Sequence, residues 1–148
     1  MSLLQCVTGQ EHQVMAPEDA RQISPLRLAY IGDTVWDLLV RSHLMLEGRN
    51  LHHMHLEATS RVNASAQAKA LERMLSELTE EETDQIHRGR NAHAKHGAPR
   101  HQSQADYQAA TGLETLIGYL YMTGRDERIR ALFEIARGTF PETENRKA

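Results

Sequence analysis

The sequence predicts an all-α fold, and three observations support this prediction. Apolar residues recur at helical spacing along most of the chain. No stretch shows the alternation of apolar and polar residues, rich in Val, Ile and Thr, that is typical of a strand. The length of 148 residues, with 40% apolar and 25% charged residues, is that of one globular domain.

The first strong helix is expected from Ser24-Pro25 to Glu47-Gly48. Serine is a favourable N-cap, proline suits the first helical position, and glycine favours a helix stop. Apolar residues cover nearly every face of this helix, with Leu28, Ile31, Val35 and Leu38 on one side and Tyr30, Trp36, Val40 and Leu44 on another. We therefore expect it to be the core helix, in the interior of the fold.

Further helices are expected over residues 51–60, 63–77, 79–90, 106–122 and 126–137. Thr79 and Glu82 have the spacing of a capping box at the start of one of them. Residues 92–105 include Gly97 and Pro99 and lack an apolar period, which predicts an exposed loop. We divide the chain into an N-terminal extension (1–21), one domain (22–138) and a polar tail (139–148).

Composition excludes several classes of protein. The formal net charge of −3 is not that of a generally basic nucleic-acid coat protein. The single cysteine, Cys6, allows no intrachain disulfide and indicates a reducing compartment. The N-terminus lacks the basic residues of a targeting signal, and no apolar run approaches the roughly 18 residues that span a bilayer. We therefore expect a cytoplasmic protein without a membrane partner.

Two carboxylates stand in apolar helical surroundings. Asp33 follows Gly32 in the predicted core helix, where glycine costs about 1 kcal/mol relative to alanine. Glu114 lies in TGLETLIGYLYM, with Gly112 and Gly118 nearby to allow close helix contact. Two buried carboxylates can share a divalent cation, and oxygen ligands suit Mg²⁺. The alternative, in which each acid is tied to an arginine or a backbone amide, stays open at this point.

Two nearby features favour structural or surface roles. Asp37 lies one turn after Asp33, and its spacing predicts an ion pair with Arg41 rather than a place in the metal site. The histidines at positions 52, 53 and 55 are interpreted as surface residues, because neither an HExxH pattern nor a neighbouring cysteine accompanies them.

Positive charge is concentrated between residues 85 and 105. This segment has four basic residues and no carboxylate, a charge of +4, so that the rest of the chain carries −7. Such a segment suits contact with nucleic-acid phosphates, although a solvated basic face is the alternative. The candidate RNA-binding residues are Arg88, Arg90, Asn91, Lys95 and Arg100, with His93 and Gln102 as further donors.

Several motifs together resemble one family. LRLAYIGDTVWDLLV resembles the signature helix of ribonuclease III, and ATGLETLIGYLY resembles the second acidic helix of that family. With VNASAQA and RGRNA between them, residues 22–137 are similar to Mini-ribonuclease III, the bacterial subgroup that has the catalytic domain without a double-stranded RNA-binding domain. The resemblance implies a ribonuclease III-like helical endonuclease domain that forms homodimers.

The resemblance also implies roles for particular residues. Asp33 corresponds to the catalytic, metal-binding aspartate and Glu114 to the metal-binding glutamate. His55 matches a histidine common in the subgroup, whose role the residues do not define. Other carboxylates of the longer ribonuclease III proteins are absent here, as in the subgroup, and their positions are occupied by Leu26, Ala29, Leu51 and Thr111.

The implied activity is Mg²⁺-dependent cleavage of double-stranded RNA, with Mn²⁺ able to substitute, leaving 5′-phosphates. The implied substrate is the precursor of large-subunit (23S) ribosomal RNA, and the implied partner is a ribosomal protein of that subunit. Two alternatives remain from the residues alone. One is a non-catalytic RNA-binding module that has kept the fold, and the other is a helical protein-interaction module whose acid pair is structural.

Overall fold

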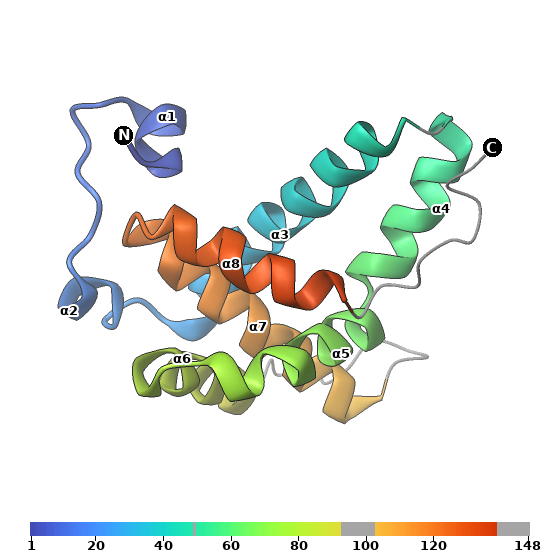
Figure 1. Cartoon of the computed structure of the whole chain (residues 1–148). Helices are drawn as coiled ribbons and strands as arrows, with labels where there is room; N and C mark the ends of the chain where they lie inside the picture. Colours follow the sequence, from blue (N-terminus) through green and yellow to red (C-terminus); the bar gives the residue numbers. More distant parts are fainter. Residues whose placement is uncertain (49, 93–102, 139–148) are drawn as a thin grey trace.

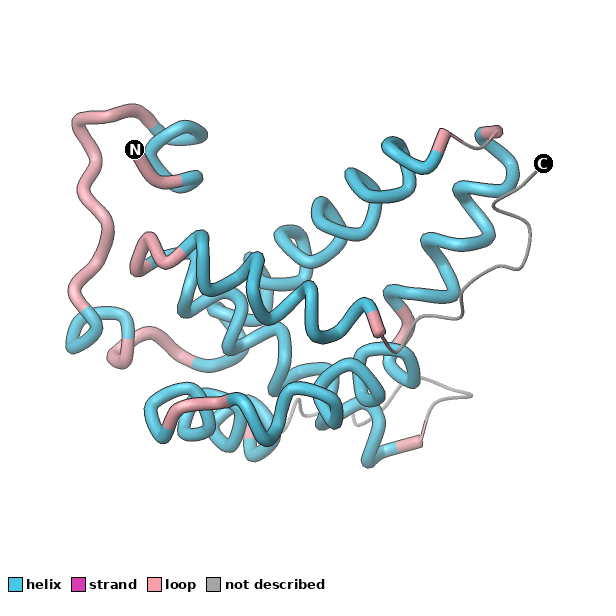
Figure 2. The backbone as a smooth tube through the Cα atoms, viewed as in Figure 1, coloured by secondary structure: helices cyan, strands magenta, loops and turns pink. Residues whose placement is uncertain are grey.

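The computed structural model describes residues 1–48, 50–92 and 103–138, and within these ranges every regular element is a helix (Figures 1 and 2). The all-α prediction is therefore confirmed. The elements are α1 (Leu3–Thr8), α2 (Pro17–Ala20), α3 (Pro25–Glu47), α4 (Leu51–Val62), α5 (Ala64–Met74), a 3-10 turn η1 (Leu75–Glu77), α6 (Glu80–Asn91), α7 (Gln104–Met122) and α8 (Asp126–Arg137).

The helices from α3 to α8 follow the predicted ranges, and their ends show the expected caps. The Ser24 hydroxyl accepts a hydrogen bond from the backbone N–H of Arg27, and Gly48 ends α3 with a φ of 72°. Thr79 and Glu82 form the predicted capping box at the start of α6. These local signals act within one turn, which is why the sequence alone specifies them.

Two elements differ from expectation. The N-terminal extension contains α1 and α2, and the backbone N–H of Leu3 donates to Asp126 Oδ2 at 2.7 Å, so that α1 is tied to the start of α8. The predicted loop over 92–105 is wrong at its end, because α7 already begins at Gln104 with Ser103 as its cap. Residues 93–102 of that loop and the 139–148 tail lie outside the described residues.

The buried central helix is α7 rather than α3. The helices α3, α5, α6 and α8 all pack against α7, and its residues from Thr115 to Tyr121 are buried. The expectation that α3 lies in the interior because apolar residues cover nearly all its faces is wrong: Tyr30 is 83% exposed and Leu38 is 52% exposed. Helix α3 packs on α7, α4 and α6, and its Trp36 ring contacts Phe133 of α8, but the apolar stripe that includes Tyr30 and Leu38 stays open to solvent.

The crossing of α3 and α7 depends on two glycines. A Cβ atom on Gly32 would overlap the backbone carbonyl of Glu114, and a Cβ on Gly118 would overlap the carbonyl of Leu28. The absence of side chains at these two positions lets the helix backbones touch. This contact fixes the position of Asp33, which follows Gly32, relative to Glu114.

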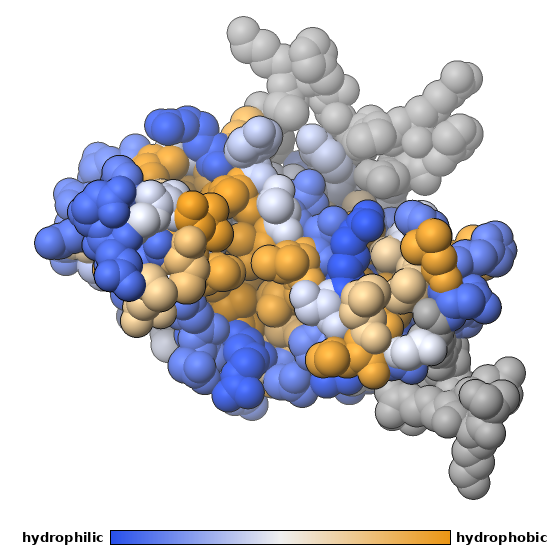
Figure 3. Space-filling view, turned by 90° about the horizontal axis from the view of Figure 1, so that it is seen from above, coloured by the Kyte–Doolittle hydropathy of each residue, from blue (hydrophilic) through white to orange (hydrophobic). Residues whose placement is uncertain are grey.

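The surface is mixed in character. On the face shown in Figure 3, apolar side chains are visible in a hollow bordered by hydrophilic residues. Large apolar side chains that are exposed on the described chain include Leu26, Leu51 and Leu56. Exposed apolar area on this scale is typical of a chain that associates with a partner.

Candidate active site

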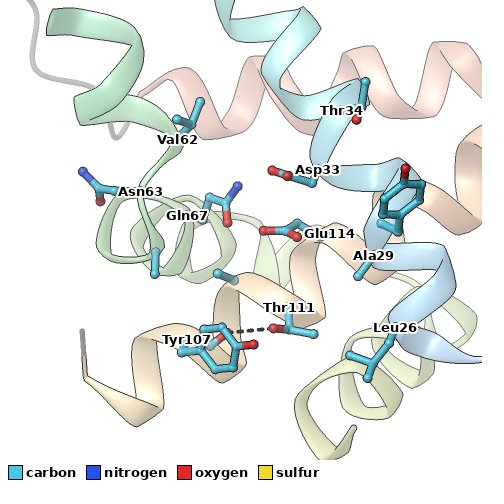
Figure 4. A pocket seen from close by; sticks show the side chains of 13 residues that line it. Leu26, Ala29, Asp33, Thr34, Val62, Asn63, Gln67, Tyr107, Thr111 and Glu114 are labelled. Atoms are coloured by element: carbon cyan, nitrogen blue, oxygen red, sulfur yellow. Dashed lines mark hydrogen bonds between the residues drawn. The ribbon is translucent and has the colours of Figure 1, made fainter. Parts of the chain in front are cut away.

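A pocket of about 470 Å³ opens between α3, α5 and the first half of α7 (Figure 4). The turn between α4 and α5 closes one side of it. The lining residues are Leu26, Ala29, Tyr30, Asp33, Thr34, Val62, Asn63, Ala64, Gln67, Tyr107, Ala110, Thr111 and Glu114. The pocket therefore contains both acids that the sequence analysis singled out.

Asp33 from α3 and Glu114 from α7 point into this pocket from neighbouring helices (Figure 4). The close crossing at Gly32 brings them together, because the residue before Asp33 lies on the backbone of Glu114. The expectation that both carboxylates are buried is only partly right: Glu114 is half-buried, but Asp33 is exposed. Asp33 lies on the open side of α3, at the mouth of the pocket.

The two carboxylates influence each other electrostatically. Burial, together with the charge of Asp33, raises the pKa of Glu114 to about 8, while the nearby Gln67 side-chain amide acts in the opposite direction. Burial and the charge of Asp37 raise the pKa of Asp33. Among the described residues, no arginine pairs with Asp33 or Glu114. The pocket thus disfavours two ionised carboxylates side by side, and a bound cation would relieve this repulsion.

Asp37 has the partner that its spacing predicts. Its carboxylate accepts a hydrogen bond from Arg41 Nε at 2.9 Å, one turn further along α3. Asp37 is not among the residues that line the pocket. The predicted ion pair of Asp37 with Arg41 is confirmed, and Asp37 lies outside the pocket.

The donor set of the pocket fits a hard divalent cation held by few protein ligands. The pocket is lined by Leu26, Ala29 and Thr111, which stand where the resemblance places carboxylates in longer ribonuclease III proteins. The described residues contain no group of three or more His, Cys, Asp and Glu side chains placed to hold a metal ion. Asp33 and Glu114 are thus left as the acidic donors, a set that suits Mg²⁺ because this ion keeps several waters and binds through one or two carboxylates.

The two residues of undefined role lie in different surroundings. Thr111 lines the pocket one turn before Glu114, and its hydroxyl donates to the carbonyl of Tyr107 at 3.0 Å. His55 is exposed on α4 and does not line the pocket.

The candidate RNA-binding residues that the structure describes lie at the C-terminal end of α6. Arg88 is half-buried and donates to the carbonyl of Ile23 at 2.8 Å and to Gln85 Oε1 at 2.9 Å. Arg90 and Asn91 are exposed. Lys95 and Arg100 lie outside the described residues. Arg88 therefore has a structural role that its charge alone did not reveal.

This end of α6 lies beside the pocket-bearing turn of α7. A Cβ on Gly89 would overlap the Thr115 hydroxyl and Gly112, and the stem of Arg90 lies against Gly112. Arg88 and Asn91 also line a second, shallower pocket with Arg21 and His87. The sequence analysis missed Arg21, because it is distant in the chain from the basic segment.

Sequence reasoning also missed Gln67 and Asn63. Gln67 is 2% exposed and belongs to the buried face of α5 that includes Ala64, Leu71 and Met74. A polar residue at a buried position of helical spacing was the available signal. Asn63 has no such signal, because its place between two helices emerges only in the fold.

Comparisons with known proteins identify the family of this chain. Residues 26–125 match the ribonuclease III domain. A Mini-ribonuclease 3 of Symbiobacterium thermophilum is 42% identical over 77% of this chain and 88% of the relative. A Mini-ribonuclease 3 of Desulfitobacterium hafniense is 43% identical over 80% of this chain and 74% of the relative. A crystal structure of a Fusobacterium nucleatum protein superposes with a TM-score of 0.72 at 29% identity, covering 81% of this chain and 96% of that one.

The fold and these matches define an endoribonuclease of the ribonuclease III class. The chain belongs to the ribonuclease III family and, within it, to the Mini-ribonuclease 3 group. The family predicted from the sequence motifs is confirmed. In the described part of the chain, none of the helices combines the length and apolar character needed to cross a bilayer.

Proposed function

We propose that this chain cleaves double-stranded RNA in a Mg²⁺-dependent reaction, with Mn²⁺ able to substitute, and that Asp33 and Glu114 are its catalytic and metal-binding residues. The observation that carries this proposal is the convergence of these two acids, 81 residues apart in the sequence, in one pocket. Since each is free of an arginine partner within the described residues, both carboxylates are available to a cation.

Asp33 and Glu114 have different roles because they differ in burial. Glu114, half-buried, provides a fixed oxygen donor at the pocket wall, and Asp33, exposed at the mouth, faces the approaching phosphodiester. The divalent ion, when bound, would lower the pKa of a water molecule and stabilise the negative charge on the phosphate. Leu26 and Ala29 contribute apolar wall that limits the space open to bulk water. The products are expected to carry 5′-phosphates.

The exposed end of α6 supports a role in binding the RNA duplex. Arg90 and Asn91 lie on the α6 end that packs against the turn of α7 bearing Thr111. Donors in this position suit contact with phosphates and 2′-hydroxyls, which identify an A-form duplex by its shape. We extend this role to Arg88 and, on charge alone, to Lys95 and Arg100.

The exposed stripe of α3 supports a homodimer. Leu26, Tyr30 and Leu38 are 42%, 83% and 52% exposed and lie at intervals of one or two turns along the helix. A single copy leaves this apolar surface in water, whereas a second copy would cover it by two-fold symmetry. Because Leu26 and Tyr30 also line the pocket, such a dimer would bring two pockets into one surface.

The biological setting follows from the family. We infer that the substrate is the 23S ribosomal RNA precursor, that a large-subunit ribosomal protein assists, and that the protein acts in the cytoplasm, where this RNA is made. The lone cysteine, Cys6, is exposed and free, which suits a reducing compartment.

Cleavage of a long RNA duplex tests the proposal. The purified chain is expected to cut the duplex with Mg²⁺ and to stop when EDTA is added. Asp33→Asn is expected to lower the cleavage rate at least about a hundredfold, since it removes a charged ligand, while leaving duplex binding in place. Binding without any Mg²⁺-dependent cutting by the parent protein would favour the alternative of a non-catalytic RNA-binding module.

A further inference from the structure

The pocket contains a buried amide that the proposed chemistry does not use. Gln67 is 2% exposed, and its side chain points toward Asp33 and Glu114 (Figure 4). Among the described residues, its Nε2 atom has no hydrogen-bond partner. An unpaired buried donor destabilises a fold, so its presence on the wall of the proposed active site calls for a role there.

The local structure holds Gln67 in place. Asn63 links α4 to α5: its Oδ1 accepts from the backbone N–H of Ala66 at 2.8 Å, and its Nδ2 donates to the carbonyls of Thr59 and Ser60 at 3.2 Å. Gln67 lies one turn after this cap, on the face of α5 that packs against α7. The amide is therefore carried by a capped helix rather than by a loop, which limits its movement.

Glu114 is the natural acceptor for this amide. Both side chains line the same pocket, Gln67 from α5 and Glu114 from α7, and their polar ends face the same part of it (Figure 4). A carboxylate has two acceptor oxygens, so it can accept from a buried amide while it also binds a cation. An amide that donates to one of these oxygens limits how the carboxylate can turn.

We propose that Gln67 is a positioning residue, whose buried amide donates to the Glu114 carboxylate and holds it in the orientation that binds the divalent cation together with Asp33. This inference rests on the proposed function, because it assumes that Asp33 and Glu114 hold a cation. Outer partners of this kind orient metal ligands, and their loss lowers metal affinity or activity about 10–100-fold.

The test uses Gln67→Met, which keeps the volume and removes the amide. Since the variant also removes an unpaired buried donor, its melting temperature without metal should equal or exceed that of the parent protein. Its affinity for Mn²⁺, measured by calorimetry, should fall about tenfold or more, and the rise in melting temperature caused by Mn²⁺ should shrink. A merely structural glutamine would show the reverse pattern of lost stability and unchanged affinity.

Leu71→Met is the matched control, because Leu71 lies one turn further along the same buried face of α5 and is 1% exposed. It should bind Mn²⁺ as the parent does. Gln67→Leu provides a second apolar variant. Unchanged Mn²⁺ affinity in both Gln67 variants would overturn the inference, as would a loss of stability in both while Leu71→Met stays intact. If the parent itself bound no Mn²⁺, the proposed function would fail instead.

Discussion

Gly32 of α3 lies directly against the backbone carbonyl of Glu114 in α7, with no room between them for a Cβ atom. Since Asp33 follows Gly32, this contact sets how near the two acids of the pocket lie to each other. Backbone atoms cannot rotate away as a flexible side chain can. The geometry of the proposed active site thus depends on a glycine that performs no chemistry.

Gly32→Ala is expected to push α3 away from α7. The unfolding free energy should fall by about 2 kcal/mol or more because backbone would have to move, and RNA cleavage should be lost in the molecules that remain folded. Chemical denaturation and a cleavage assay measure the two effects. Gly138→Ala is the control, since the nearest atom to a Cβ there is an Arg73 nitrogen at an ordinary 3.4 Å. Parent-like stability in Gly32→Ala would contradict this account of the crossing.

Glu114 should make the stability of the metal-free protein depend on pH. Its pKa rises from an ordinary 4.5 to about 8 on folding, so the folded state holds a proton that the unfolded state has lost between these values. Stability from this group is therefore fully present below pH 4.5, falls as pH rises toward 8, and levels off above it.

Glu114→Gln removes this titration. In EDTA, the difference in unfolding free energy between Glu114→Gln and the parent protein should grow from pH 5 to pH 8 in favour of the variant, as measured by urea denaturation. Glu72→Gln, at an exposed position of α5, is the control and should follow the parent curve. Parallel stability curves for Glu114→Gln and the parent would contradict a raised pKa of Glu114 in the folded state.

Arg90 and Arg88 should differ in what they contribute. Arg90→Ala should leave the fold intact and lower the slope of log Kobs against log salt for duplex binding by about 1, because one phosphate contact is lost. Arg88→Ala should in addition cost about 1–3 kcal/mol of stability, since its bonds to Ile23 and Gln85 disappear. Arg130→Ala, at an exposed arginine of α8, serves as the control. An unchanged salt slope in Arg90→Ala would leave the end of α6 as a solvated basic face.

Tyr30 should be central to dimer formation. Tyr30 is 83% exposed and lies in the apolar stripe of α3, so Tyr30→Glu places a charge in the proposed interface. This change is expected to raise the dimer dissociation constant roughly thirtyfold or more, as measured by sedimentation equilibrium. Leu75→Glu carries the same charge on another exposed apolar residue, in η1, and should leave the dimer intact. A stable dimer of Tyr30→Glu would exclude the α3 stripe as the interface.

The helices and the two acids were predictable from the sequence because their signals are local or compositional. Ser24, Thr79 and Glu82 act within one helical turn, and an aspartate or glutamate in an apolar helix is visible without a structure. The position of Gln67 was less visible, because a single amide at helical spacing does not reveal which pocket it faces. Asn63 gave no signal, since its two roles, ending α4 and starting α5, exist only where the helices meet.

The sequence by itself determined the all-α class, the boundaries of α3 to α8 to within a few residues, and the pair Asp33 and Glu114. Only the tertiary structure decided that α7 rather than α3 is the central helix and that Asp33 is exposed at the pocket mouth. It also decided that Arg88 donates a hydrogen bond to the carbonyl of Ile23. The physical reason is that periodicity records how apolar each face of a helix is, whereas burial depends on which neighbours cover that face. An apolar stripe on α3 has the same pattern whether α7 or a second copy of the chain packs on it.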